Sequence, residues 1–509
     1  MSSSNDLRSQ AENIFNLCKQ TYPDSLILKL AQLLHTSPNP ETRTMSTILL
    51  RRHLTHHHDD SFIYPHITAS TQSTLRSLLL SSLHQEPVKS IAKKLCDTVS
   101  ELSSALLSED LASWPDLLPF LFQLFTSPVA RLQEISLLVF AQLAHYIGET
   151  LIPQLSTLHS VFLRSLSAAT SSSDVRIAAL AASINFVQCL SNPSDRDRFQ
   201  DLLPLMMQTL TEALNSGQEA IAQDALKLLI ELAGTEPRFL RRQIVDVVDA
   251  MLQIKGTRHL AIEFVVTLAE ARERAPGMMR KLPQFVKKLF GVLMNLLLDI
   301  EDDAAWHAAV SEDEDAGETS NYGFGQECLD RLSISLGGNT IVPVAYELLP
   351  TYLSAPEWQK RHAALVAFAQ IAEGCSKVMT KNLEHVLSMV LNSFPDPNPR
   401  VRWAAINAIG QLSTDLGPNL QINYHHLVLP ALAGAMDDFQ NPRVQAHAAS
   451  AVLNFTENCN PDILIPYLDG IVSKLLVLLQ ILTPSLMKRM IGVLLVLVTV
   501  FWVTKDLYP

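Results

Sequence analysis

An acidic segment is the most strongly charged part of the chain. Seven carboxylates fall within the fifteen residues 301–315, together with no lysine or arginine and one bulky aromatic residue, Trp306. Like charges at this spacing repel one another and leave little apolar surface to offset the entropy of ordering, so the pattern predicts a flexible acidic loop over 301–318. The loop would contact basic proteins, or in the alternative serve as a solubilising surface insertion. Its carboxylates belong to Glu301, Asp302, Asp303, Glu312, Asp313, Glu314, Asp315 and Glu318.

A second candidate site is a ridge of one aromatic and two amide side chains. Trp403, Asn407 and Gln411 recur every four residues and therefore share one face of a helix. A tryptophan beside an amide can hold an extended peptide, because the ring packs on aliphatic stems while the amide bonds the peptide backbone. The alternative is that Trp403 is buried against the next repeat. Neighbouring units carry His362 and Ala446 at its position, so the sequence does not predict a continuous ladder.

Signatures of catalysis and of metal binding are missing from the sequence. It has no phosphate-binding Gly-x-x-x-x-Gly-Lys, no nucleophile Gly-x-Ser-x-Gly and no zinc-binding His-Glu-x-x-His. The histidine-rich run 56–60 lacks a second ligand cluster and is predicted to be a solvated turn. Six scattered cysteines without Cys-x-x-Cys indicate buried thiols in a reducing compartment. We therefore expect no enzyme activity, no cofactor and no metal.

A helical repeat must position the candidate residues. In the stretch 396–412, turn residues lead into a helix whose predicted packing face is rich in alanine, which allows a neighbouring helix to approach closely. Copies of this pattern recur mostly every 41 to 46 residues, as in two-helix HEAT units. The packing face consists of Val401, Ala404, Ala405, Ala408, Ile409 and Leu412. The position of Arg402 is held in the other copies by Arg43, Lys89, Gln133, Arg176, Ala222, Arg258, Arg361 and Gln445.

A second recurring element carries Leu-Pro or Ile-Pro before or early in an apolar run. A proline there can open or kink a helix, so each unit is predicted to be a proline-bearing helix A, a turn and an alanine-faced helix B. Neither helix can bury its apolar stripe alone, and stacking of units gives a continuous core. The predicted fold is all-α, a right-handed superhelical α-solenoid of HEAT-type helical hairpins. The prolines are Pro119, Pro204, Pro283, Pro350, Pro430 and Pro466.

Composition narrows the class of partner and the compartment. The net charge of −12 over 509 residues makes direct nucleic-acid binding a poor expectation and a basic protein partner a better one. The beginning of the sequence has no signal-peptide pattern, which indicates cytosol or nucleus.

The end of the chain departs from the repeat. The fourteen residues 490–503 carry no charge, whereas a membrane span needs roughly 20 such residues. We expect an atypical terminal helix or a truncated end, with a membrane-associated tail as the alternative. The predicted domains are N-terminal repeats over 1–250, repeats with the acidic loop over 251–480 and a divergent apolar tail over 481–509.

Four stretches of sequence resemble one protein family closely. They are residues 396–412, residues 441–455, the pair 327–332 with 336–338, and residues 371–375. They resemble the importin-β (karyopherin-β) superfamily, and within it the importin-five branch, also called karyopherin beta three. The resemblance covers about residues 5–480, is similar to the N-terminal half of such proteins and points to a plant-like member. Family members continue through further repeats, and the tail of this chain is unlike them.

The resemblance implies a nuclear import receptor. Such proteins wrap basic cargo on an acidic surface lined by B helices and release it when Ran-GTP binds the N-terminal repeats. It implies that the acidic loop neutralises cargo or couples Ran binding to release, and that Trp403 and Asn407 hold cargo. The residues expected to contact Ran are Arg43, Arg51, Arg52, Lys89, Lys93 and Lys94.

The expected partners and location follow from the same resemblance. Partners are Ran-GTP, nucleoporins and basic cargo such as ribosomal proteins or histones. The protein is expected to shuttle between cytoplasm and nucleus, with nuclear-envelope association if its tail inserts. The alternative function is a HEAT-repeat scaffold for protein complexes that ignores the nucleotide state of Ran, with membrane association through the tail.

Overall fold

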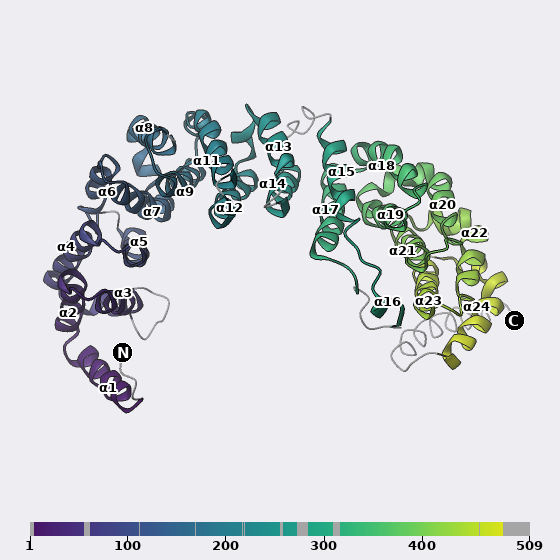
Figure 1. Ribbon diagram of the computed structural model, residues 1–509, viewed down its shortest axis with the longest axis horizontal. Coiled ribbons are helices and arrows are strands. Elements are labelled where there is room, and N and C mark those ends of the chain that lie inside the picture. The colour runs from purple at the N-terminus through teal and green to yellow at the C-terminus, as the bar shows by residue number, and fades with distance from the viewer. Residues whose placement is uncertain are drawn as a thin grey trace. The chain divides into compact units, whose positions relative to one another are not determined.

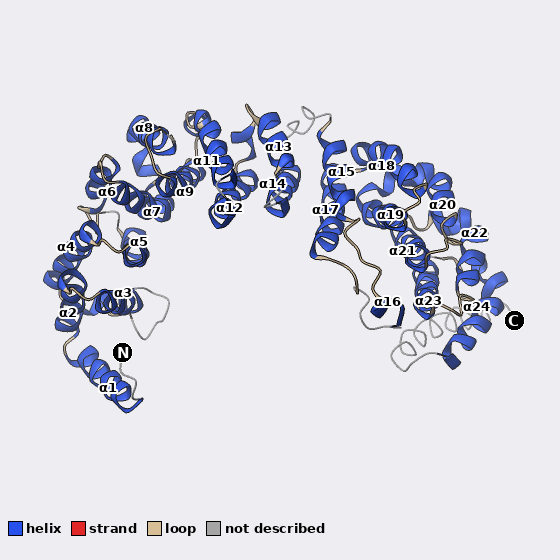
Figure 2. Cartoon of the chain, in the orientation of Figure 1, coloured by secondary structure: helices blue, strands red, loops and turns tan. Residues whose placement is uncertain are grey.

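A computed structural model describes residues 5–54, 62–254, 258–271, 284–308 and 316–481, apart from the single residues 111, 168, 216, 218 and 458. Throughout these ranges the chain forms helices joined by loops (Figure 2). It divides into two compact units, Met1–Ile244 and Val245–Pro509. The division into functional regions over 1–250, 251–480 and 481–509 stays a prediction.

The first unit stacks helical hairpins in chain order. Helices α3, α5, α7 and α9 each contact the next B helix, and α2, α4, α6 and α8 contact their own partners (Figure 1). Short 3₁₀ turns join several hairpins. The helices are α1 (Asn5–Thr21), α2 (Pro23–Thr36), α3 (Pro40–Leu54), α4 (Ala69–Gln85), α5 (Lys89–Glu109), α6 (Leu117–Phe125), α7 (Ala130–Ile147), α8 (Leu155–Leu166), α9 (Ser173–Cys189), α10 (Pro193–Asp197), α11 (Leu203–Asn215) and α12 (Glu219–Thr235). The 3₁₀ turns are η2 (Tyr64–His66), η3 (Glu149–Gln154), η4 (Gln200–Leu202) and η5 (Pro237–Leu240).

The second unit repeats the arrangement and carries the candidate cargo residues. The B helices α17, α19, α21 and α23 pack in succession, with the A helices α18, α20 and α22 on the opposite side (Figure 1). The helices are α13 (Ile244–Gln253), α14 (Arg258–Glu270), α15 (Phe285–Leu296), α16 (Ala304–Ala308), α17 (Ser320–Leu336), α18 (Gly338–Leu353), α19 (Trp358–Met379), α20 (Leu383–Leu391), α21 (Pro399–Asp415), α22 (Asn419–Ala435), α23 (Pro442–Glu457) and α24 (Pro461–Ile481), with the 3₁₀ turn η8 (Thr380–Asn382).

The B helices pack through the predicted alanine face. All six residues assigned to that face of α21, from Val401 to Leu412, have no exposed surface. The small side chains let consecutive B helices approach closely, because alanine adds little bulk between two backbones. The predicted all-α solenoid of HEAT-type hairpins is confirmed.

A ladder of polar contacts also links successive repeats. Arg361 pairs with Asp396 through two hydrogen bonds of 2.7 and 3.0 Å, and Arg402 pairs with Asp438 in the same way at 2.9 and 2.7 Å. In each case the remaining guanidinium nitrogen, Nη1, donates to two backbone carbonyls of the turn before its own helix. Gln445, at the same repeat position, donates to the Met436 carbonyl at 2.8 Å. The recurring arginine is therefore a structural residue that closes the turn and joins it to the next repeat.

The predicted proline-bearing helices are present. Pro119 is the third residue of α6 and Pro204 the second residue of α11, while Pro350, Pro430 and Pro466 lie inside α18, α22 and α24. Pro283 lies outside the described residues. In the described part of the chain no single helix is long and apolar enough to cross a membrane. One bent pair, 130–147 with 149–166, passes by length and composition alone. The predicted tail, 481–509, lies outside the described residues except for Ile481.

Candidate functional site

Three carboxylates on consecutive B helices form the best candidate for a cargo-binding surface. Asp330 lies on α17, Glu373 on α19 and Asp415 at the last residue of α21. They are 43 and 42 residues apart, so they occupy the same position in three successive repeats. We call these three residues the acidic row.

The acidic row carries negative charge that the repeat stack itself does not neutralise. Burial raises the pKa of Asp330 above its ordinary value, and the neighbouring Glu373 adds to the rise. Burial likewise raises the pKa of Asp415, with further contributions from Glu373 and Asp330. Within the described ranges none of the three forms an ion pair. Each carboxylate would therefore gain from a cation supplied by a partner.

Gln411 holds one member of the row in place. Its Nε2 donates a hydrogen bond of 3.0 Å to the Asp415 carboxylate one helical turn later. This bond favours the charged form of Asp415 and opposes the effect of burial on its pKa. The predicted peptide-contacting residue Gln411 is thus exposed on α21 and orients a carboxylate.

A glycine sets the separation of two of these helices. A Cβ atom added to Gly374, directly after Glu373, would lie 2.3 Å from the Ser333 carbonyl carbon on α17. No side chain fits there, so the backbones of α17 and α19 meet at this point. The close contact fixes Asp330 and Glu373 relative to each other.

The predicted ridge on α21 is partly covered by the next repeat. Trp403 stacks on His447 of α23, with ring centroids 4.4 Å apart and an angle of 25° between the rings. His447 Nε2 also lies 3.1 Å from Asn407 Oδ1. Trp403 and Asn407 are both half-buried. Only part of the indole ring and part of the amide therefore remain accessible to a partner.

The acidic segment differs from the prediction over its first residues. Glu301, Asp302 and Asp303 are exposed, as a loop would have them, but residues 304–308 form α16 and Trp306 is only 3 % exposed. The prediction of a flexible loop is therefore wrong for residues 304–308. Trp306 finds its packing surface on helices far along the chain, beside Arg400 and Arg443. Glu312, Asp313, Glu314 and Asp315 lie outside the described residues, and Glu318 pairs through its backbone with Ile300.

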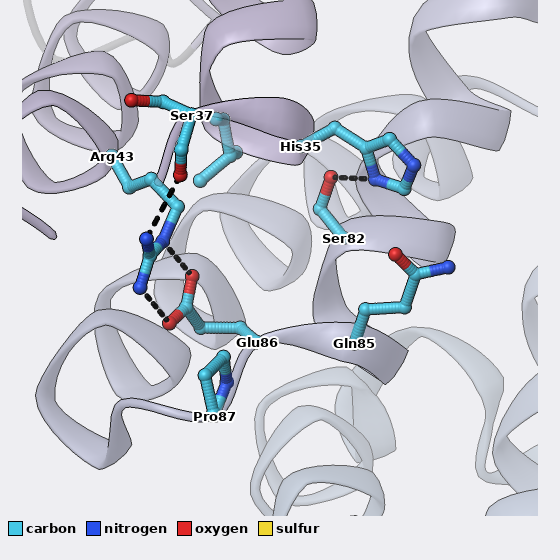
Figure 3. Close-up of a pocket in the computed structure, with 8 residues that line it drawn as sticks. His35, Ser37, Arg43, Ser82, Gln85, Glu86 and Pro87 are labelled. Atoms are coloured by element: carbon cyan, nitrogen blue, oxygen red, sulfur yellow. Dashed lines mark hydrogen bonds and ion pairs between the residues drawn. The ribbon is translucent and has the colours of Figure 1, made fainter. Parts of the chain in front are cut away.

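Among the residues expected to contact Ran, Arg43 is built into the repeat stack. It is 9 % exposed and binds both carboxylate oxygens of Glu86 at 2.9 and 3.1 Å, while its Nη1 donates to the Ser37 and Pro38 carbonyls. Figure 3 shows this pair at one side of a polar cavity of about 170 Å³, opposite a 3.2 Å contact between His35 and Ser82. We correct its predicted role: Arg43 stabilises the contact between repeats and presents no charge to a partner.

The other five basic residues lie on the exposed sides of α3 and α5. Arg51 pairs with Asp97 at 3.3 Å and with Glu101, and its side chain is 44 % exposed. Lys89 pairs with Asp174 at 2.6 Å, and Lys93 lies 3.5 Å from Glu134. Arg52 and Lys94 are exposed. These cations keep part of their surface in solvent, where a partner can reach them.

For metal binding, the described ranges contain no group of three or more histidine, cysteine, aspartate or glutamate side chains placed to hold an ion. The histidine-rich run 56–60, predicted to be a solvated turn, lies outside these ranges. Burial raises the pKa of the Cys375 and Cys328 thiols to about 12, which makes both unreactive.

The sequence reasoning missed all three members of the acidic row, Asp330, Glu373 and Asp415. Asp330 and Glu373 lie within stretches that carried the family resemblance, 327–332 and 371–375. A signal was present, because acidic residues 43 and 42 positions apart match the repeat interval. Recognising it required knowing which face of helix B stays open after the repeats stack.

Three protein-family models match successive parts of the chain. A family model described as "IPO5-like, TPR repeats" matches residues 87–250, and one described as "Importin repeat" matches residues 249–343. A third, described as "Vacuolar 14 Fab1-binding region", matches residues 359–414.

Among curated relatives, importin subunit beta-3 of Saccharomyces cerevisiae is 31 % identical over 428 residues. A probable importin-5 homolog of Dictyostelium discoideum is 25 % identical over 395 residues. These alignments cover 82 % and 75 % of this chain. The chain in turn spans only 38 % and 35 % of the length of these two relatives.

Solved structures of Kap121p share the fold. Kap121p bound to RanGTP matches with a TM-score of 0.80 and 27 % identity, covering 97 % of this chain and 47 % of that chain. The complex with Pho4p matches with a TM-score of 0.81 at 27 % identity, covering 97 % of this chain and 48 % of that one. A Kap121p variant with three acidic residues replaced by lysine has a TM-score of 0.82 and 27 % identity, with 97 % and 47 % covered. Those three residues are 43 and 42 positions apart in Kap121p.

Proposed function

The chain belongs to the importin-β superfamily, and from this premise we propose that it is a nuclear import receptor that binds basic cargo proteins and RanGTP. Cargo binds to the acidic row on α17, α19 and α21. RanGTP binds the N-terminal repeats and releases the cargo. The receptor shuttles between cytoplasm and nucleus and contacts nucleoporins on the way, as suggested by the structure of Kap121p bound to Nup53p.

The observation that carries this proposal is the spacing of the acidic row. Asp330, Glu373 and Asp415 follow one another at intervals of 43 and 42 residues, the same intervals as the three acidic residues replaced by lysine in the Kap121p variant. Both sets consist of two aspartates flanking one glutamate. The raised pKa values of Asp330 and Asp415 support the same conclusion, since burial and, after it, repulsion from the neighbouring carboxylates disfavour the charged forms until a cation arrives.

The role of the amide residues fits a peptide ligand. Asn407 lies on the same ridge of α21 as Asp415, two turns earlier, and Gln411 lies between them. An extended peptide crossing the B helices would place backbone groups near these amides and lysine side chains near the carboxylates. Trp403 would contact the aliphatic part of such side chains through its exposed edge.

RanGTP binding is proposed for the exposed cations of the first repeats. Arg51, Arg52, Lys89, Lys93 and Lys94 retain exposed surface on α3 and α5. Arg43 is left out of this set because its guanidinium is committed to Glu86. A basic surface in an otherwise acidic protein would attract a negatively charged partner.

The test uses the full chain and a fluorescent peptide that carries three lysines. Glu373→Lys should weaken peptide binding at least tenfold, because it places a cation between two carboxylates that the peptide needs. Glu384→Lys is the matched control, since Glu384 is an exposed glutamate on the A helix α20 and undergoes the same change of charge. RanGTP should displace the peptide from the unmodified protein, and Ran with GDP should not.

Two results would contradict the proposal. Equal effects of Glu373→Lys and Glu384→Lys would remove the acidic row as the cargo site and leave only general charge attraction. Peptide binding that ignores the nucleotide bound to Ran would favour the alternative of a repeat scaffold.

A further inference from the structure

His447 of α23 contacts two side chains of the neighbouring helix α21 (Figure 1). Its ring stacks on the Trp403 indole, with centroids 4.4 Å apart and an angle of 25° between the rings. Its Nε2 lies 3.1 Å from Oδ1 of Asn407, which stands one helical turn after Trp403. A carbonyl oxygen only accepts a hydrogen bond, so His447 Nε2 carries the proton and donates it. The histidine therefore fixes which end of the Asn407 amide faces α23.

The other end of this amide is left for a further acceptor. Because Oδ1 accepts from His447, the NH2 group of Asn407 lies on the side of the amide that the imidazole does not occupy. Within the part of the chain that the structure describes, this NH2 group donates to no backbone or side-chain acceptor. Asn407 is half-buried, so part of its amide stays in contact with solvent. The amide is thus held at its oxygen and available at its nitrogen.

A second histidine of the same unit makes the same arrangement, and there the NH2 group has an acceptor. His259 of α14 stacks on Phe324 of α17, again with centroids 4.4 Å apart and an angle of 25° between the rings. His259 Nε2 contacts Asn321 Oδ1, and Asn321 Nδ2 donates to an Asp299 carboxylate oxygen at 2.6 Å. The histidine in this arrangement therefore turns the asparagine NH2 group toward an acceptor.

The two arrangements differ in what accepts the hydrogen bond. Asp299 accepts it from Asn321 within the chain, whereas Asn407 has no such acceptor among the described residues. Asn407 lies two turns before Asp415 on the ridge of α21, where the cargo peptide is proposed to cross. A lysine side chain offers no acceptor, while every residue of an extended peptide carries a main-chain carbonyl. A main-chain carbonyl is therefore the group that a basic segment supplies to this donor.

We propose that His447 is a positioning residue that holds the Asn407 amide so that its NH2 group donates to a main-chain carbonyl of the bound cargo. This inference rests on the proposed receptor function. Without the bond from His447, the amide is free to rotate and to present its oxygen, which a peptide carbonyl repels. Fixing the amide beforehand removes that loss of freedom from the cost of binding. Recognition of positive charge stays with the acidic row, and Asn407 recognises the main chain.

The test measures binding of the three-lysine peptide to the full chain. His447→Phe keeps a ring on Trp403 but removes the donor, and it should weaken binding about fivefold. His447→Gln keeps an amide N–H at a reach similar to that of imidazole Nε2, and it should stay within about twofold of the unmodified chain. His259→Phe is the matched control, because it removes the same bond where the asparagine has an internal acceptor. It should leave the peptide affinity unchanged.

Two further measurements separate positioning from a general effect on the fold or on charge. In an Asn407→Ala background, His447→Phe should have no further effect on affinity, because the amide that it positions is gone. The salt dependence of binding should be the same with and without His447→Phe, since the contact between an amide and a carbonyl involves no net charge. Circular dichroism with thermal unfolding checks that each variant is folded. If His447→Phe unfolds, His447→Met, which also lacks the donor, takes its place.

Three results would overturn the inference. They are an unchanged affinity of His447→Phe, an equal loss of affinity with His447→Gln, and a loss that persists in the Asn407→Ala background. If one of these is obtained while Glu373→Lys weakens binding as proposed, only the positioning role fails. If the peptide does not bind the unmodified chain, the receptor proposal fails together with this inference.

Discussion

At the scale of single residues, His362 is the clearest titratable group in the core. It lies on α19 between the rings of Tyr322 and Trp358, whose centroids are 5.9 and 6.0 Å from its own. Its Nδ1 has no hydrogen-bond partner among the described residues. Burial, assisted by the nearby Arg400, lowers the pKa of His362 to about 3. The imidazole of His362 is therefore neutral in the folded protein at neutral pH.

This histidine gives the fold a dependence on pH. Between its unfolded pKa of 6.5 and its folded pKa of about 3, the unfolded chain binds a proton that the folded chain does not. Stability from this group is therefore complete above pH 6.5 and is lost as pH falls, by about 1.4 kcal/mol per pH unit. His362→Phe should flatten the fall in urea midpoint between pH 6.5 and 5. His426→Gln, an exposed control on α22, should leave the slope as it is. Identical slopes for all three proteins would contradict this account.

At the scale of elements, burial distinguishes arginines that stabilise the repeat stack from arginines that a partner can reach. Arg43 and Arg51 both lie on α3, yet the Arg43–Glu86 pair is 11 % and 3 % exposed, whereas the side chain of Arg51 is 44 % exposed. Removing one partner of a buried pair leaves an uncompensated charge, while exposed pairs contribute little. The same substitution should thus mainly reduce stability at Arg43 and mainly reduce partner binding at Arg51.

We expect Arg43→Ala to lower the unfolding free energy of the first repeats by about 3 kcal/mol and to leave intrinsic RanGTP affinity little changed. Arg51→Ala should cost less than about 1 kcal/mol of stability and weaken RanGTP binding several-fold. Thermal unfolding and a RanGTP titration measured on the same samples check both. The assignment fails if Arg51→Ala destabilises the chain as much as Arg43→Ala does.

The elements also show what sequence reasoning can and cannot supply. Alanine spacing identified the buried face of α21 because helix periodicity is a local property of about a dozen residues. The recurring arginine marked the repeat register for the same reason. The docking of Trp306 could not be foreseen, because Arg400 and Arg443 follow it by roughly 100 and 140 residues. The acidic row could not be assigned either, since its meaning depends on three helices stacked side by side. The plant-like origin stays a prediction.

At the scale of the whole molecule, stacked repeats should respond to damage locally. Each hairpin contacts its neighbours in sequence, so stability is close to a sum of repeat and interface contributions. A change in the core of one repeat therefore should not spread through both units. This behaviour differs from that of a protein with one shared core.

Ala405→Asp tests this expectation, since Ala405 has no exposed surface and a carboxylate there would be buried without a partner. Hydrogen exchange should accelerate strongly in α19, α21 and α23 and stay unchanged in α7 and α9. Ser388→Asp on the exposed side of α20 serves as control and should change neither region. Uniform loss of protection over both units would mean that the chain unfolds as one cooperative body.

The glycine at position 374 has a consequence for the ligand. That close contact and the alanine faces let the B helices approach closely, and the axes of packed helices usually lie about 8–10 Å apart. An extended peptide covers such a step in two to three residues. As the proposed cargo site, the acidic row would favour peptides in which lysines recur about every second or third residue. Side chains that never touch the ligand would set this spacing.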